Sequence, residues 1–317
     1  MAELRLALAG LREQIRGRRS PDPLVSAASL PDGEDLFALF DELRRRMANV
    51  GMSEHSGESD EFGMDFDLLI RAEPLLEFLR ERYWRVEVSG RHWIPERGPC
   101  LFVANQSGLL PYDGCMLSHI LGRGQELAAR PKFLVGDWLI TLPFMQAFLA
   151  RIGAVRDCSE NLGRLLSLGR RVVAFPEGMA GATKLYDQRY RLQDFGSSPA
   201  IRVAAEAGVP IVPVGIVGAE EAQPLLSRQS GLGRALGLPL LPLTPTFPLL
   251  GPLGLLPLPS RWRILFGEPL EFASREGDGE GERAGPGWEL AAGTEAIRLR
   301  IGELIAEGRI GHSADPA

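Results

Sequence analysis

The spacing of hydrophobic and polar residues changes several times along the chain, and each spacing predicts a different element. Apolar residues recur at helical intervals in six segments, namely 2–17, 34–48, 67–83, 113–121, 141–150 and 288–307. Alternating or continuous apolar runs predict strands at 85–89, 99–104, 132–135, 171–175, 210–217 and 262–266. Strands that alternate with helices predict an α/β fold with a mostly parallel central sheet, flanked by helices and extended by helices at both ends.

Three segments interrupt these regular patterns. Residues 53–67 are acidic and contain glycine, which predicts a mobile stretch. Residues 236–260 are very apolar, but proline recurs too often for a regular helix. Residues 273–287 are rich in Gly and Glu and are typical of a linker. The predicted divisions are an N-terminal helical and partly mobile extension at 1–66, a main domain at 67–272, and a linker with an amphipathic helix at 273–317.

Composition narrows the functional classes. With 317 residues and 45% hydrophobic content, the chain has enough apolar side chains for a large core. The formal net charge of -6 argues against a nucleic-acid binder. Three cysteines in no zinc or redox spacing indicate a reducing cytoplasm. No signal peptide or ordinary transmembrane helix is predicted, because no apolar run reaches about 20 residues.

The first segment with candidate chemistry reads FVANQSGLLPYDG, at 102–114. Here polar side chains follow directly after a buried strand, where open α/β sheets form their sites. The candidates are Asn105, Gln106, Ser107 and Asp113. The alternative is a helix start, with Ser107 or Asp113 as its cap.

A second buried strand ends in the same way, with Pro176, Glu177 and Gly178. Gly178 permits a tight turn or a close backbone approach to a ligand. Glu177 is suited to accept a hydrogen bond from an alcohol substrate or to orient a basic partner. The alternative is a strand-end turn with a solvated carboxylate. A third strand, VPIVPVGIV at 209–217, ends before two glutamates.

In this order, the three segments resemble the motifs of the glycerolipid acyltransferase superfamily, which includes the lysophosphatidic acid acyltransferases. The family pattern is Asn-His followed by Asp, then Phe-Pro-Glu-Gly, then Val-Pro-Ile-Val-Pro-Val. Asn105 to Asp113, Phe175 to Gly178 and Val209 to Val214 match it, and Gly153 to Arg156 loosely match a further motif. The resemblance implies a glycerol-3-phosphate (1)-acyltransferase-like fold over 67–272.

The same resemblance implies transfer of a fatty acyl group from acyl-CoA or acyl carrier protein to a hydroxyl of a glycerolipid-type acceptor. It implies no resident cofactor and no metal, a cytoplasmic location and peripheral attachment to the membrane surface. The implied catalytic positions are Gln106 and Asp113. The implied substrate-binding residues are Asn105, Ser107, Arg156, Pro176, Glu177, Gly178, Lys184, Arg189 and Arg191.

The chain departs from this family at Gln106, where the family has its histidine base. An amide has no useful basicity near neutral pH. The alternative to an enzyme is therefore a catalytically degenerate acyltransferase that binds lipid or acyl-CoA or serves in regulation. Hydrolysis of an acyl ester through Ser107 ranks last, because no Gly-x-Ser-x-Gly motif occurs. His119 is a poor substitute base, since on a shared helix it would lie about 9 Å beyond Asp113.

A second departure is Ala180, in a position where many family members have an arginine suited to phosphate. Lys184, Arg189 and Arg191 follow and either supply that charge or lie on a solvated surface. The apolar segment 236–260 either lines an acyl groove or rests on the membrane, or else covers the core. The resemblance favours the lipid interpretation.

Overall fold

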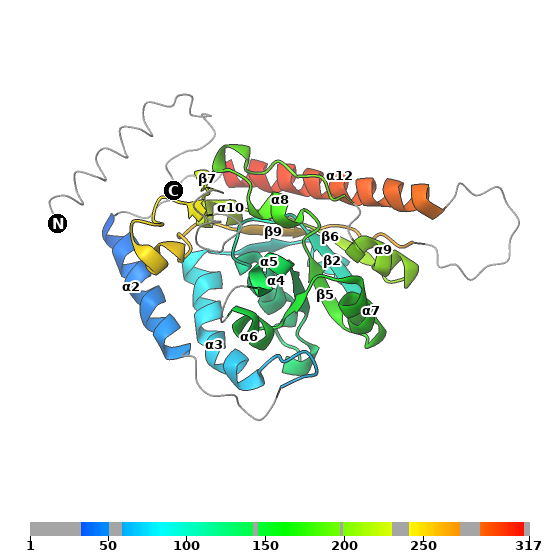
Figure 1. Cartoon of the computed structure of the whole chain (residues 1–317), viewed down its shortest axis with the longest axis horizontal. Helices are drawn as coiled ribbons and strands as arrows, with labels where there is room; N and C mark the ends of the chain where they lie inside the picture. The colour runs from blue at the N-terminus through cyan, green and yellow to red at the C-terminus, as the bar shows by residue number, and fades with distance from the viewer. Residues whose placement is uncertain are drawn as a thin grey trace, which may run out of the picture.

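The structure is a computed structural model, and it describes residues 33–50, 59–141, 145–196, 199–229, 241–272 and 286–313. Its centre is a seven-stranded sheet (Figure 1). The strands, in spatial order, are β1 (Glu87–Ser89), β9 (Arg263–Phe266), β6 (Ile211–Val217), β2 (Cys100–Ala104), β5 (Arg171–Ala174), β3 (Lys132–Val135) and β4 (Ala154–Arg156). All neighbours pair in parallel except β6 and β9, which are antiparallel. The predicted, mostly parallel sheet is confirmed.

The central strands are apolar throughout because helices cover both of their faces. In β2, Phe102 packs into one core cluster, while Leu101 and Val103 pack into another. β6 divides in the same way, with Val214 on the first side and Val217 on the second. A strand buried on both faces reads as a continuous hydrophobic run, which is the pattern that the sequence shows.

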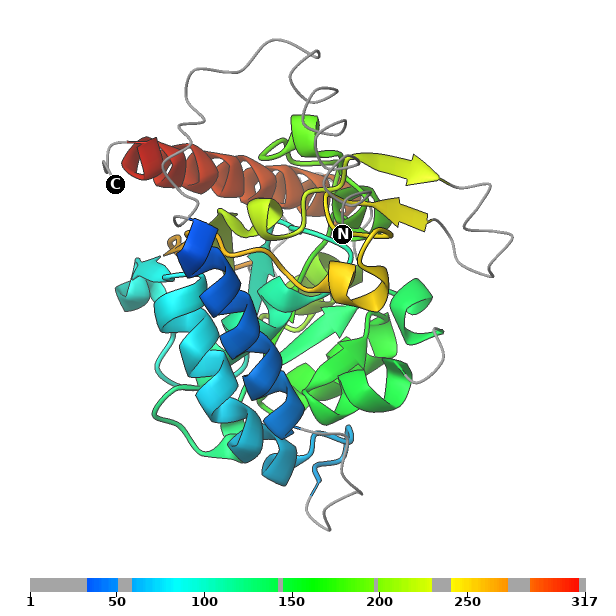
Figure 2. The ribbon, with the colours of Figure 1, turned by 90° about the vertical axis from the view of Figure 1, so that its left-hand side faces the viewer.

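Helices form a layer on each side of the sheet (Figures 1 and 2). The first layer contains α2 (Gly33–Val50), α3 (Phe66–Phe78), α4 (Tyr112–Gly122), α5 (Asp137–Ile140) and α6 (Met145–Arg151), and it contributes Leu43, Phe78, Met116 and Leu149 to the first cluster. The second layer contains α7 (Ser159–Ser167), α9 (Pro199–Glu206) and α12 (Pro286–Ser313), and it contributes Leu165, Ile201 and Ile301 to the second cluster.

The acidic stretch 53–67 was predicted to be mobile, but its described part, 59–67, makes specific contacts with the rest of the fold. Asp65 caps α3 by accepting a hydrogen bond from the Leu68 amide at 2.9 Å, and it pairs with Arg151 at 2.9 Å. Asp60 pairs with the buried Lys132. Local acidity indicated a solvated segment, but cations supplied by distant parts of the chain hold these carboxylates in place.

Two predicted helices are present with changed limits, and two predicted segments lie wholly or mostly outside the described residues. The helix predicted at 67–83 is α-helical to Phe78 and ends in a π-helical turn, Leu79–Tyr83. The helix predicted at 141–150 begins at Met145 among the described residues. The helix at 2–17 and most of the linker at 273–287 lie outside the described residues. The proposed domain boundaries remain predictions.

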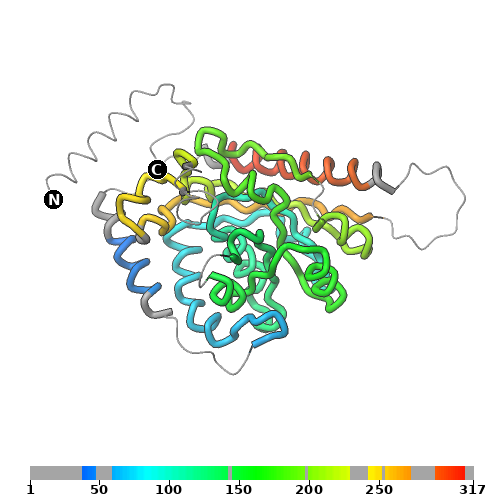
Figure 3. The backbone as a smooth tube through the Cα atoms, viewed as in Figure 1, coloured from blue at the N-terminus to red at the C-terminus, as the bar shows by residue number. Residues whose placement is uncertain are grey.

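The proline-rich segment is irregular, as its prolines predict. Its described part begins with β8 (Leu241–Leu243), which pairs with β7 (Ser227–Gln229), and it continues through a 3-10 turn, Gly251–Leu255. The Tyr83 hydroxyl then donates to the Pro257 carbonyl at 2.7 Å, which anchors the segment before it enters β9. Figure 3 shows this segment in yellow, near α2. Among the described helices, none is both long and apolar enough to cross a membrane.

Candidate active site

The candidate residues lie at the carboxyl ends of β2, β5 and β6, which are neighbours in the sheet. The chain leaves β2 toward β3 on one side and later crosses from β5 to β6 on the other side. Such a reversal of direction opens a crevice at the strand ends, and ligands of α/β sheets bind there.

Asn105, directly after β2, extends the sheet with its side chain. Its amide donates to the Ile216 carbonyl at 3.0 Å and accepts from the Ile216 amide at 2.7 Å. The residue is fully buried. Asn105 therefore fixes the end of β2 against β6 and positions the residues that follow it.

Asp113, in the first turn of α4, turns its carboxylate back toward the end of β2. It accepts hydrogen bonds from the backbone amides of Ser107 at 2.9 Å and Gly114 at 2.8 Å. Burial raises the pKa of this carboxyl to about 6, and the Ser107 and Gly114 amides oppose that rise. A carboxyl that titrates there can take and release a proton near neutral pH.

Gln106 is held between two segments. Its backbone amide donates to Glu177 Oε1 at 2.8 Å. A Cβ on Gly181, in α8 (Gly178–Ala182), would lie 3.1 Å from Gln106 Cβ, so α8 packs directly on the glutamine. The side-chain oxygen of Gln106 is buried and has no hydrogen-bond partner among the described residues. A buried carbonyl oxygen without a partner is ready to accept a hydrogen bond from a ligand.

Glu177 ties three segments together and is buried. Oε1 accepts from the Gln106 amide, and Oε2 accepts from the Gln193 amide at 2.7 Å. Lys184 Nζ lies 3.4 Å from Glu177 Oε2 and 3.1 Å from Glu220 Oε1. Burial raises the pKa of Glu220 to about 7, and Lys184 opposes this rise. One buried cation is thus shared by two buried carboxylates.

Tyr190 completes this charged cluster. Its backbone adopts a φ of 65°, and its amide donates to Glu220 Oε2 at 3.0 Å. Its hydroxyl donates to Glu221 Oε1 at 2.8 Å and accepts from the Gly218 amide at 2.9 Å. Burial raises the pKa of this phenol well above its usual value. Sequence reasoning missed Glu220 and Tyr190; the position of Glu220 just after β6 was the available signal.

An apolar cavity of about 220 Å³ opens beside these residues. Residues 107–110 form one wall, and Lys184 and Glu220 line another. The proline-rich segment forms a roof through residues between 242 and 258. Gln223 joins wall and roof, since its Oε1 accepts from the Leu110 amide at 3.3 Å and its Nε2 donates to the Leu255 carbonyl at 3.4 Å. The described part of the proline-rich segment lines this cavity, and its role as an acyl groove or a membrane-resting segment remains a prediction.

The part of the chain that carries Gln106, Asp113 and Glu177 is similar to a known family. Residues 85–217 match the family model described as Acyltransferase. This part of the chain is thus similar to the acyltransferase family. The resemblance to the glycerolipid acyltransferase superfamily is thereby confirmed over these residues.

Three proteins that are similar to this chain follow. An uncharacterized protein of Mycobacterium tuberculosis is 42% identical over 224 residues, which make up 69% of this chain and 62% of that protein. The match therefore spans less than two thirds of that protein's length. A lyso-glycine lipid O-acyltransferase of Phocaeicola vulgatus is 29% identical over 121 residues, 37% of this chain and 39% of that protein. The solved structure of the 1-acyl-sn-glycerophosphate (LPA) acyltransferase PlsC from Thermotoga maritima is 16% identical, covers 86% of this chain and 96% of its own, and gives a TM-score of 0.48.

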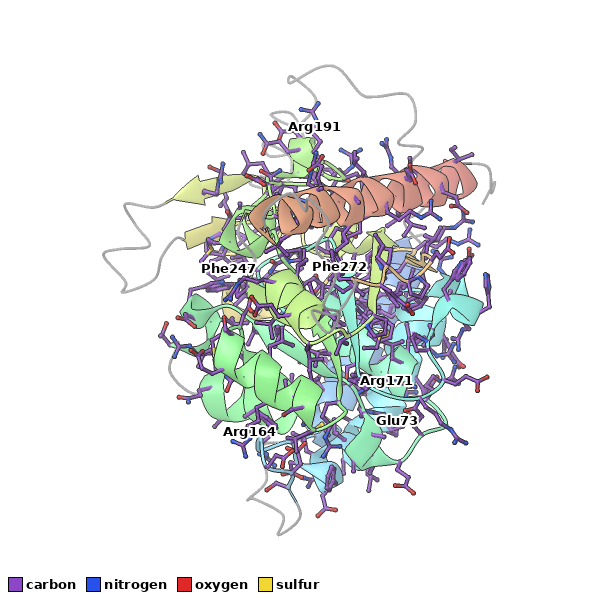
Figure 4. All side chains as sticks on the ribbon, turned by 90° about the vertical axis from the view of Figure 1, so that its right-hand side faces the viewer. Glu73, Arg164, Arg171, Arg191, Phe247 and Phe272 are labelled. Carbon is purple, nitrogen blue, oxygen red and sulfur yellow. The ribbon has the colours of Figure 1, made fainter. Side chains whose placement is uncertain are left out.

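The predicted residues Arg156, Arg189 and Arg191 are not among those that line the cavity. Arg156 is exposed and forms a two-pronged pair with Asp137, at 2.6 and 2.7 Å. Arg189 lies 4.6 Å from the centroid of the Tyr186 ring, which lines the cavity. Arg191 is exposed and projects at the outer edge of the molecule (Figure 4).

Pro176 is half-buried, and Gly178 is exposed with a φ of 54°, which begins the turn into α8. This left-handed conformation favours glycine over residues with a Cβ. The two residues therefore shape the loop after β5 that carries Glu177. Whether they contact a substrate remains a prediction.

His119 does not face the site. Its Nε2 lies 3.1 Å from Glu77 Oε1 on α3, and its Nδ1 lies 3.7 Å from Glu73 Oε2. These three side chains are close enough to bind a metal ion. Both carboxylates, however, are already paired with arginines, Glu73 with Arg130 at 2.8 Å and Glu77 with Arg123 at 3.0 Å. The arrangement fits an ion-pair network that joins α3 to α4.

Proposed function

We propose that this chain is an acyltransferase that moves a fatty acyl group from an acyl thioester, acyl-CoA or acyl carrier protein, to a hydroxyl of a lysolipid. The observation that carries the proposal is the apolar cavity, which meets Ser107 and the Lys184–Glu220 pair at the strand ends of a domain similar to the acyltransferase family. Acyl transfer to a hydroxyl needs an apolar surface that holds the acyl chain and, next to it, polar groups that hold the hydroxyl.

The cavity suits an acyl chain. Its roof and walls are mostly apolar side chains, among them Leu225, Phe247 and Leu256. Each methylene buried there contributes about 0.8 kcal/mol, so six methylenes contribute about 5 kcal/mol. A volume of 220 Å³ is below the roughly 300–1,000 Å³ of ligand pockets, which suits the end of one chain rather than a whole lipid.

The acceptor that fits best carries no phosphate monoester. Ala180 offers no charge, and Lys184, the cation in the cavity wall, is already shared by Glu177 and Glu220. A doubly charged phosphate beside two buried carboxylates would be repelled. The Phocaeicola vulgatus relative, by its name, acylates a lyso-glycine lipid, which agrees with a headgroup other than phosphate.

Peripheral attachment to a membrane accompanies the proposed reaction, because the lysolipid acceptor and its diacyl product reside in the membrane. Leu243, Leu249 and Leu250, in or beside the roof, are among the exposed large apolar residues. Such residues insert readily into the interfacial layer of a bilayer. The purified chain should co-sediment with phospholipid vesicles, and a chain that stays in the supernatant at all vesicle concentrations would contradict this attachment.

Acyl transfer from radiolabelled acyl-CoA to a panel of lysolipids, with and without a phosphate monoester, tests the proposal. The expected result is a labelled diacyl product, formed faster with phosphate-free acceptors and lost in Asp113→Ala. Asp187→Ala, at an exposed position, is the matched control and should keep the rate of the unmodified chain. Equal rates for Asp113→Ala and the unmodified chain would refute the assigned site.

The buried side-chain oxygen of Gln106 favours a second candidate, a binding protein that holds the acyl donor without turning it over. An unpartnered carbonyl oxygen can hold a ligand, but an amide cannot serve as a base. In the assay above, this candidate predicts saturable binding of acyl-CoA and no labelled product with any acceptor.

A further inference from the structure

The proposed transfer leaves one proton without a destination. The attacking hydroxyl must lose its proton, and the Gln106 amide at the family's histidine position cannot take it. Among the described residues at the strand ends, the acidic side chains differ in availability. Glu177 is occupied by two backbone amides and Lys184, and Glu220 is occupied by Lys184 and the Tyr190 amide. Asp113, by contrast, faces neutral donors, namely the Ser107 and Gly114 amides and the Ser107 hydroxyl.

Ser107 lies between this carboxylate and the cavity. The residue lines the cavity, and its hydroxyl oxygen is buried without an aligned hydrogen-bond partner among the described residues. Its own backbone amide donates to Asp113 Oδ2 at 2.9 Å, which places the hydroxyl beside the carboxylate. The Ser107 hydroxyl faces the Asp113 carboxylate and lowers its pKa, so it is placed to pass a proton between the cavity and Asp113.

Building on the proposed acyltransferase function, we propose that Ser107 relays the proton of the acceptor hydroxyl to Asp113, in place of the missing histidine. The acceptor oxygen gives its proton to Ser107 Oγ while the Ser107 hydroxyl proton passes to the Asp113 carboxylate. The acceptor oxygen forms a bond to the thioester carbonyl carbon. The carbon–sulfur bond then breaks, and the departing thiolate takes back the proton through Ser107, leaving a free thiol and an unchanged protein.

The electrostatic setting of Asp113 supports this relay. Burial raises the pKa of the carboxyl to about 6, so it is a base at pH 7 and can still hold a proton transiently. The groups that face it are the Ser107 hydroxyl, the Ser107 and Gly114 amides, and the thiol of Cys115, whose pKa is itself raised by burial. No cation faces the carboxylate in the part of the chain that the structure describes. A general base works best with a pKa close to the working pH.

The test compares steady-state acyl transfer from acyl-CoA to the best lysolipid acceptor in matched variants. Ser107→Ala should lower kcat about 10²- to 10⁴-fold with little change in KM, the range lost with a general base. Ser167→Ala, an exposed serine on α7, is the control and should keep full activity. The double variant Gln106→His/Ser107→Ala should regain rate, because an imidazole supplies the base that the relay replaces.

The pH profile adds a readout that a purely structural serine would not change. The unmodified chain should lose activity as the pH falls through about 6, since Asp113 must be ionised, and this limb should disappear from the residual rate of Ser107→Ala. A Ser107→Ala variant within about twofold of the unmodified rate would overturn the relay. Activity only in Gln106→His would also overturn the relay but leave the acyltransferase site intact. No transfer by any variant would refute the proposed function itself.

Discussion

Replacing Asp113 by asparagine should change how the stability of the protein depends on pH. The folded carboxyl titrates near pH 6, whereas its ordinary value is 3.8. At 1.36 kcal/mol for each tenfold change in proton affinity, ionising Asp113 in the folded state costs about 3 kcal/mol. Below about pH 4 the carboxyl is neutral in both the folded and the unfolded protein, and its stabilising contribution is fully present. As the pH rises from 4 through 6, the unfolded protein ionises first, and this contribution is lost.

Asparagine has nearly the same shape and does not titrate. It keeps one oxygen for two backbone donors, so a pH-independent loss of about 1–3 kcal/mol is expected. On top of this constant offset, Asp113→Asn should gain relative stability as the pH rises. Between pH 4.5 and 7.5, the difference in the free energy of unfolding should move by about 2 kcal/mol in favour of the variant.

The assay is urea unfolding of both proteins at half-unit pH intervals from 4.5 to 7.5, with the free energies extrapolated to water. All other titrating groups are common to the two chains and cancel in the difference. A difference in the free energy of unfolding that stays constant within about 0.5 kcal/mol over this pH range would show that Asp113 ionises at its ordinary pKa. Burial would then not raise the pKa of Asp113, and the proposed proton relay would lose its base.

Two further predictions concern the walls of the cavity. Lys184→Met removes the cation shared by Glu177 and Glu220 and should lower the free energy of unfolding by about 3–5 kcal/mol. Lys184→Arg keeps a cation and should lower it less. If urea unfolding of Lys184→Met shows a loss below about 1 kcal/mol, the buried pairing is contradicted. Leu256→Trp fills the cavity and should reduce kcat/KM for a palmitoyl thioester at least tenfold relative to a butyryl thioester, since two displaced methylenes cost about 1.6 kcal/mol; an unchanged ratio would place the acyl chain elsewhere.

The central strands and the edge of the site were predictable because local patterns determine them. β2, β5 and β6 are buried along their whole length, so their sequences are mostly apolar, and Gln106 and Glu177 follow within three residues of the ends of β2 and β5. β4 and α7 escaped prediction, because the strand is only three residues long and the helix shows mostly polar residues outside its buried leucines.

Contacts between distant segments account for what the sequence could not predict. Asn105 was expected to bind substrate, but both groups of its amide bond to β6, more than one hundred residues away. Lys184 was expected either to bind phosphate or to be solvated, but it lies buried between two carboxylates that come from different strand ends. Neither arrangement leaves a trace in local hydrophobic spacing, because each depends on a partner that only the folded sheet brings near.

The most direct test of the account is to measure, in one reaction, the free thiol released from acyl-CoA and the acyl ester formed on a phosphate-free lysolipid by the unmodified chain. The account predicts equal amounts of thiol and ester, both lost in Asp113→Ala. Thiol without ester would identify a hydrolase, and neither product, despite saturable donor binding, would identify a binding protein; either result would contradict acyl transfer at this site.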